Sequence, residues 1–182
     1  MRHYKTLKGL ISGLERAGAC EEALDWLKTQ PNIEAAVRNA QAGWLTWALM
    51  KGFIARENLI NWSKLDGVDW SNLLRKQPQF AEHCDWGKLN SHDWAYLLCN
   101  QPQFGNRCNW EKLGGWAWSW LLRKQPQFAE HCNWSKLNGV DWSNLLRKQP
   151  QFAEHCDWEK LDGWDWAYLL DKQPQFEKFR RR

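Results

Sequence analysis

Residues 135–158 read SKLNGVDWSNLLRKQPQFAEHCDW, and residues 63–86 repeat this stretch with one change, Asp66 in place of Asn138. Five related units follow one another at a spacing of 24 residues. Two tryptophan series, one proline series and one phenylalanine series carry the spacing, and they begin at Trp62, Trp70, Pro78 and Phe80. A unit this short cannot bury its own tryptophans, so the units must stack on one another.

Each unit has the apolar spacing of two helices. Trp70, Leu73 and Leu74 lie at i, i+3 and i+4 of a first helix, and Asp69 precedes them as the expected N-cap. Pro78 then suits the first turn of a second helix, with an apolar face of Phe80, Ala81 and Cys84. The sequence therefore predicts an all-α fold, a short α-solenoid of five 24-residue helix-turn-helix repeats.

A leucine-rich-repeat-like α/β solenoid is the alternative, because 24 residues also fall within the repeat length of that family. It would place a strand at residues 80–86, with Phe80, Glu82 and Cys84 on one face. Glu82 and its equivalents Glu130 and Glu154 would then enter the core, where unpaired carboxylates are costly. The all-α fold is favoured for this reason.

The periodicity divides the chain into three segments. Residues 61–176 hold the repeats, residues 177–182 form a basic C-terminal tail, and residues 1–60 form an N-terminal helical cap module. Within this module, residues 4–53 predict three or four short amphipathic helices, with the core residues Leu24, Trp26, Leu27, Ile33, Val37, Trp44, Trp47 and Leu49. The end of a solenoid needs a cover, which favours a cap over an independent functional domain.

Two stretches carry a resemblance to known sequences. CDWEKLDGWDWAYLL at residues 156–170, followed by QPQF at 173–176, resembles tryptophan-rich tandem repeats of bacterial and phage proteins of uncharacterised function. EALDWL at residues 22–27, with GWLTW at 43–47, resembles a small helical module of bacterial and phage hypothetical proteins. The resemblance implies no known activity and transfers no catalytic residue.

Composition and charge limit the classes of function. The net charge is +4, of which the tail residues 177–182 supply +3, so the body is nearly neutral and lacks the charge of a typical nucleic-acid binder. The sequence contains neither a signal peptide nor an apolar run long enough to span a membrane. We therefore expect a cytoplasmic protein whose cysteines are reduced thiols.

Neither a metal site nor an active site is expected. His83-Cys84 and its copies lack the ligand spacing of a structural zinc site. Every other reactive group is copied along the repeats, whereas catalysis needs one constellation of unlike groups. No glycine-rich phosphate loop is present either. We expect no enzyme, no cofactor and no metal.

The units differ from one another on the outer face of the first helix. Positions 68 and 72 and their equivalents vary among Val, His, Trp, Asn and Tyr, while the core positions stay constant. Exposed aromatic residues are typical of interface hot spots. The sequence thus predicts a non-enzymatic protein-binding scaffold, such as an adaptor or inhibitor of a bacterial or phage complex. The predicted partner-binding residues are Tyr96, Trp116, Trp120, Arg123, Arg147, Trp164, Tyr168 and Asp171.

Two alternatives stay open for this face. Its aromatic residues could pack under the N-terminal module or against a second copy of the chain, which would mean self-association. Alternatively, the face could bind single-stranded nucleic acid through aromatic residues interleaved with basic ones such as Arg123, Lys124 and Lys148, although Cys99, Asn100 and Asp171 interrupt the basic row.

Overall fold

The computed structural model describes residues 4–54 and 57–180, and these residues form helices and no strand. The predicted all-α fold is confirmed, and the leucine-rich-repeat-like alternative is excluded. The chain divides into two compact units, Met1–Leu89 and Asn90–Arg182. This division falls inside the second repeat, and the predicted segment boundaries at residues 60 and 176 stay predictions.

The first unit holds the N-terminal module and the first repeat. The module has four α-helices, as predicted, and the repeat has one α-helix and several short 3₁₀ helices, labelled η. The elements are α1 (Leu7–Arg16), α2 (Glu21–Lys28), α3 (Ile33–Asn39), α4 (Ala42–Met50), η1 (Glu57–Leu59), η2 (Trp62–Lys64), α5 (Gly67–Lys76), η3 (Pro78–His83) and η4 (Trp86–Lys88).

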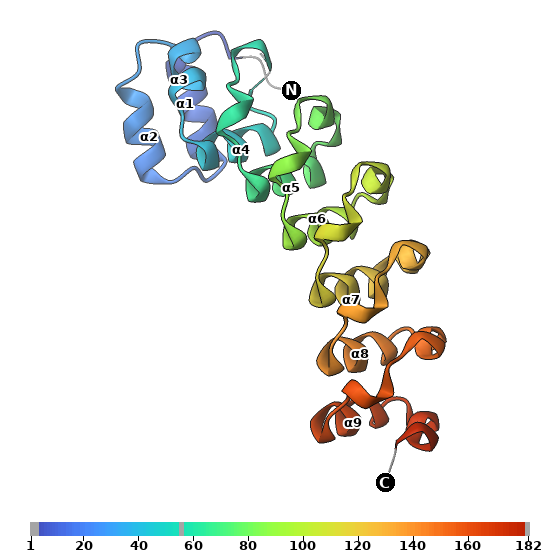
Figure 1. The fold of residues 1–182 in the computed structure, drawn as a ribbon. Helices are drawn as coiled ribbons and strands as arrows, with labels where there is room; N and C mark the ends of the chain where they lie inside the picture. The colour runs from blue at the N-terminus through green and yellow to red at the C-terminus, as the bar shows by residue number, and fades with distance from the viewer. Residues whose placement is uncertain (1–3, 55–56, 181–182) are drawn as a thin grey trace. The chain divides into compact units, whose positions relative to one another are not determined.

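The second unit holds the remaining repeats. Figure 1 shows α6, α7, α8 and α9 following one another in series, and each packs against the next. The elements are α6 (Ser91–Leu98), η5 (Pro102–Arg107), η6 (Trp110–Lys112), α7 (Gly115–Lys124), η7 (Pro126–His131), η8 (Trp134–Lys136), α8 (Gly139–Leu146), η9 (Pro150–His155), η10 (Trp158–Lys160), α9 (Gly163–Leu170) and η11 (Pro174–Phe179).

The first helix of each repeat begins earlier than predicted. The N-cap of α5 is Asp66, and Asp69 is its N3 residue, so the predicted N-cap at Asp69 is wrong. Asp66 accepts from the Asp69 N–H at 2.8 Å, and the Asp69 carboxylate accepts from the Asp66 N–H, which makes a capping box. The Asp-Gly and Asn-Gly pairs are thus helix starts.

The second helix of each repeat is a 3₁₀ helix and not an α-helix. In the first repeat it spans Pro78–His83 and ends at Cys84, whose backbone is extended. Six residues separate Gln77 from Cys84, which is two turns of 3₁₀ helix, and 3₁₀ geometry occurs mainly in such short connecting segments. Phe80 still points into the core, as predicted.

The core of the repeats is built from tryptophan and leucine. Trp70, Trp118 and Trp142 are fully buried. In the first, third, fourth and fifth repeats the opening tryptophan packs on this buried ring, as in the stack of Trp134 on Trp142 with ring centroids 5.5 Å apart. In the same four repeats it also contacts the phenylalanine of its own repeat, so each of them contributes one aromatic cluster to the core.

Neighbouring repeats are joined through side chains that bond to backbone. Lys136 Nζ donates to the carbonyls of Glu111 and Leu113 at 2.6 and 3.0 Å, and Lys160 makes the same pair of bonds one repeat later. Gln149 Nε2 donates to the Arg123 carbonyl at 3.1 Å. These bonds join neighbouring repeats within the second unit.

Close backbone approach also joins the repeats. A Cβ at Gly139 would lie 2.1 Å from Asp165 Oδ2 and 2.3 Å from the Lys160 carbonyl oxygen. At the equivalent Gly163, nothing lies within 4 Å. The same sequence position is therefore closed in one repeat and open in another.

The α7 helix starts differently from the others. Gly114 and Ala117 occupy the two capping-box positions, and no side chain of α7 itself caps this helix start. Instead, the Gly114 N–H donates to Ser91 Oγ of the preceding repeat at 3.0 Å. Ser91 occupies the position that Gly115 and Gly139 occupy in later repeats. In those repeats the glycine lies beside an aspartate of the next repeat, and that aspartate accepts from the N–H of its own N-cap. At α7 the pair is Ser91 with Ala117, and the serine takes over as the acceptor for the N-cap N–H.

We expect Gly139→Ala to lower the free energy of unfolding by about 1–3 kcal/mol, because its Cβ would overlap backbone. Gly163→Ala, the matched control, should be neutral or stabilising by up to about 1 kcal/mol, since alanine favours the helix. Urea unfolding followed by helical circular dichroism measures both. Equal effects of the two substitutions would contradict the close approach.

We also expect Ser91→Gly to destabilise the chain by about 1 kcal/mol, because it leaves the Gly114 N–H without its acceptor. Ala117→Asp alone should also destabilise, since Ser91 occupies the space beside the new carboxylate. The double variant should recover part of both losses, because it recreates the Gly/Asp pairing of the other repeats. Additive effects in this double-mutant cycle would rule out the exchange.

Candidate partner-binding surface

The candidate surface lies in the second unit, on the outer side of α6 to α9. Each capped helix start places one variable residue at the second helical position, and a second variable residue follows four positions later. The first row is His92, Trp116, Val140 and Trp164, and the second row is Tyr96, Trp120, Asn144 and Tyr168. The exposed fractions are 49% for Trp116, 86% for Trp164 and 48% for Tyr168.

Four of these side chains form one aromatic cluster on α6 and α7. The Trp116 ring stacks on His92 with centroids 4.6 Å apart and contacts Trp120 at 5.1 Å. Trp120 also contacts Tyr96 at 5.9 Å. The Lys124 ammonium lies 5.7 Å from the Trp120 centroid, over its ring. We call His92, Tyr96, Trp116 and Trp120 the α6–α7 cluster.

A second group joins α8 to α9. The Arg147 guanidinium lies 3.8 Å from the centre of the Tyr168 ring, and it donates to the Tyr168 carbonyl and to Asp171 Oδ2. Lys172 pairs with the same carboxylate at 3.1 Å. The Lys172 ammonium, followed by the Arg147 guanidinium, lowers the pKa of Asp171. These contacts hold Arg147 in a fixed place.

The structure brings six of the eight predicted site residues together in two groups of three. Tyr96, Trp116 and Trp120 come together, as do Arg147, Tyr168 and Asp171. The other two are apart from these groups. Trp164 is almost fully exposed, and Arg123 is half-buried with an Nε that has no hydrogen-bond partner.

The predicted site omitted one residue of the α6–α7 cluster, His92, and one residue that contacts it, Lys124. His92 and Lys124 both contact the predicted tryptophans. His92 occupies the position of Trp116 one repeat earlier, and equivalent residues of stacked repeats lie side by side. This rule could have assigned His92 to the site from the spacing alone.

The thiols of the repeats are poorly suited to chemistry. Burial raises the pKa of Cys84, Cys108, Cys132 and Cys156 to about 12, so they stay protonated at neutral pH. A protonated thiol is neither a nucleophile nor a metal ligand. These four cysteines serve as small packing side chains that are half-buried in the repeats.

The histidines of the second 3₁₀ turn stack on tryptophan. His131 and His155 lie 4.5 and 4.4 Å from Trp110 and Trp134, and each is 3.6 Å from the preceding glutamate. In the first repeat, Glu57 joins Glu82 and His83, and the three ligand atoms lie within 4.8 Å of one another. Among the described residues this is the one group of three such side chains that could hold a metal ion.

Comparison of the chain with family models, with curated proteins and with solved structures finds no match. The resemblance to tryptophan-rich tandem repeats stays a prediction. Among the described helices, none is both long and apolar enough to cross a membrane.

We expect iodoacetamide at pH 8 to modify Cys20 in the folded chain well before Cys84, Cys108, Cys132 or Cys156. Cys20 is exposed, whereas a thiol of pKa about 12 is deprotonated in roughly one molecule in ten thousand at that pH. Peptide mapping by mass spectrometry gives the order of modification, and urea should make all the sites equal. Fast modification of Cys132 in the folded chain would contradict its burial.

Proposed function

We propose that the chain is a non-enzymatic scaffold that binds a protein partner through the outer rows of α6 to α9. The observation that carries this proposal is the exposure of Trp116 and Trp164 at a position where the copied repeats have valine. Exposed tryptophan costs solubility unless a partner covers it, and tryptophan is enriched in interface hot spots.

The α6–α7 cluster supports the proposal because its rings are already ordered. Trp116 lies between His92 and Trp120, and Trp120 lies against Tyr96 and under Lys124. Binding to a pre-ordered ring loses less side-chain entropy than binding to a mobile one. We therefore propose Trp116 and Trp120 as the centre of the surface, with Lys124 favouring a partner that presents an acidic residue beside an apolar one.

The second group suits the rim of such a surface. Arg147 and Lys172 share the single carboxylate of Asp171, which offsets one of their two positive charges and so reduces the attraction for phosphate. This pairing weakens the case for single-stranded nucleic acid, which needs free cations along a row of stacked rings. In the proposed function, Arg147 positions Tyr168, while Trp164 adds apolar area.

The test is capture from a bacterial lysate on the immobilised full chain, with Trp116→Ala/Trp120→Ala as the variant. Val140→Ala/Asn144→Ala is the matched control, because it changes the same two positions one repeat later, where the rows have no aromatic ring and truncation should cost little binding energy. We expect a discrete protein that survives nuclease and high salt, is lost with the first variant and is kept by the second. With the purified partner, the first variant should bind at least about tenfold more weakly, as expected for hot-spot residues.

Two outcomes would overturn the proposal. Captured material that disappears on nuclease treatment and at high salt would assign the face to nucleic acid. Equal capture by the wild type and Trp116→Ala/Trp120→Ala would show that the α6–α7 cluster is not the binding surface. Sedimentation of the two proteins separates self-association from partner binding, since a dimer formed through this face would dissociate in the first variant.

A further inference from the structure

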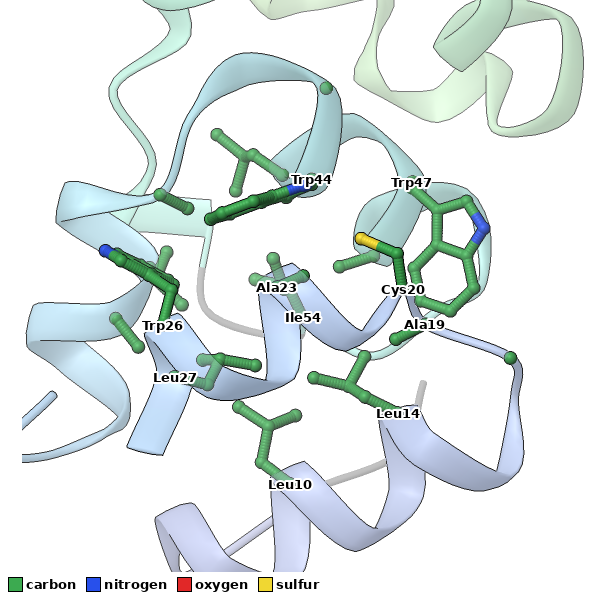
Figure 2. Close-up of a pocket in the computed structure, with 17 residues that line it drawn as sticks. Leu10, Leu14, Ala19, Cys20, Ala23, Trp26, Leu27, Trp44, Trp47 and Ile54 are labelled. Atoms are coloured by element: carbon green, nitrogen blue, oxygen red, sulfur yellow. The ribbon is translucent and has the colours of Figure 1, made fainter. Parts of the chain in front are cut away.

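The N-terminal module contains a hollow within its own core. A pocket of about 310 Å³ lies among α1, α2, α3, α4 and the segment after α4. Figure 2 shows Ala23 and Ile54 in the middle of the labelled side chains, with Leu10, Leu14 and Leu27 on one side and Trp44 on the other. The hollow belongs to the first unit and is separate from the proposed partner-binding surface.

Small residues create this space. On α2, α3, α4 and the segments between helices, the lining has alanine or glycine at seven positions, namely Gly18, Ala19, Ala23, Ala36, Ala40, Gly43 and Ala48. Large rings stand around them and leave the middle unfilled. Trp26, Trp44 and Trp47 were predicted as core residues, but they are only half-buried, because one side of these rings borders the hollow.

The hollow is open to solvent on one side, where Gly18, Cys20 and Gly43 of its lining are exposed. The side chains that border it lack the dispersion contacts of a close-packed interior. Water gains little here, since it needs polar partners and the lining is almost entirely hydrocarbon. A ligand that fills the space would recover those contacts.

The lining specifies the chemistry of such a ligand. It contains no charged side chain, and its polar side-chain groups are the Cys20 thiol and the indole N–H groups of its three tryptophans. An ionic ligand would be desolvated without a counter-charge, so the occupant must be uncharged. The Trp26 and Trp44 rings lie 5.4 Å apart at an angle of 48° and so offer aromatic surface in two orientations.

The volume indicates the size of the ligand. An apolar cavity of roughly 150 Å³ holds one benzene molecule. The hollow has about twice that volume, at about 310 Å³. We propose that the N-terminal module binds an uncharged, flat aromatic molecule of two rings in this hollow. The module is then a small-molecule site as well as the neighbour of the first repeat.

The test uses 6-propionyl-2-(dimethylamino)naphthalene, an uncharged dye of two fused rings whose emission shifts to the blue in an apolar site, titrated into the full chain. We expect saturable binding with one site per chain. Ala23→Leu places a larger side chain in the middle of the hollow and should weaken binding at least tenfold. Ala35→Leu is the matched control, because it makes the same change on α3 at a residue outside the lining, and it should bind like the wild type.

A second measurement needs no variant. The exposed Cys20 lies at the hollow, so 2-naphthalenemethanol should slow its alkylation severalfold, while the charged 2-naphthoate should not. This comparison stays valid even if Ala23→Leu fails to fold, which circular dichroism would reveal.

Three results would overturn the inference. They are the absence of saturable dye binding, dye binding that Trp116→Ala/Trp120→Ala abolishes, and protection of Cys20 by the anion as strong as by the alcohol. The second result would place the dye on the α6–α7 cluster. None of the three depends on whether a protein partner exists, so this test and the test of the proposed function fail independently.

Discussion

The stacking of the repeats depends on hydrogen bonds from the side chains of one repeat to the backbone of the repeat before it. Lys136 and Gln149 reach carbonyl groups that the short 3₁₀ turns and helix ends of the preceding repeat cannot satisfy internally. The first repeat makes the same bonds to the N-terminal module, where Lys64 donates to the carbonyls of Arg38 and Ala40, and Gln77 to that of Met50. The module therefore presents acceptors in the way a preceding repeat does, which is the property that a cap needs.

The hydrogen bonds between repeats explain which positions of a repeat can differ in amino acid from one repeat to the next. The residues that join repeats are the lysine, the glutamine, the helix-start glycine and the buried tryptophan, and they hold one side of each helix. The second helical position faces away from these bonds, so His, Val or Trp can occupy it without disturbing the frame. At α7 even the frame has changed, because Ser91 and Ala117 replace the usual Gly/Asp pair. The helix that carries both Trp116 and Trp120 is therefore capped by the preceding repeat, through the hydrogen bond that the Gly114 N–H donates to Ser91.

The sequence was a good guide wherever one period decided the structure. The spacing of Trp70, Leu73 and Leu74 predicted the helix and its buried face correctly. It could not distinguish Asp66 from Asp69 as the N-cap, because both residues take part in the capping box. The sequence predicted a second helix beginning at Pro78 but not its 3₁₀ type, because apolar spacing over six residues is nearly the same in 3₁₀ and α geometry.

Contacts between repeats or helices were harder to predict. The stack of His92 on Trp116 and the approach of Glu57 to His83 join residues that are 24 and 26 positions apart. The first follows from the repeat length, whereas the second does not, since Glu57 lies outside the periodic region. The half-burial of Trp26, Trp44 and Trp47 was also unpredictable, because it results from many small residues spread over three helices and the segments between helices.

The two units use tryptophan in opposite ways, and this difference bears on what each can bind. On α7 the ring of Trp116 projects from a row of residues, and a projecting ring is useful when a large partner supplies the surrounding surface that excludes water. In the N-terminal module the rings of Trp26 and Trp44 border a concave apolar hollow that is open to solvent on one side. A small molecule can bury most of its surface there, because the protein surrounds it on the other sides. The geometry of the rings therefore favours a macromolecule on the repeats and a small aromatic ligand in the module.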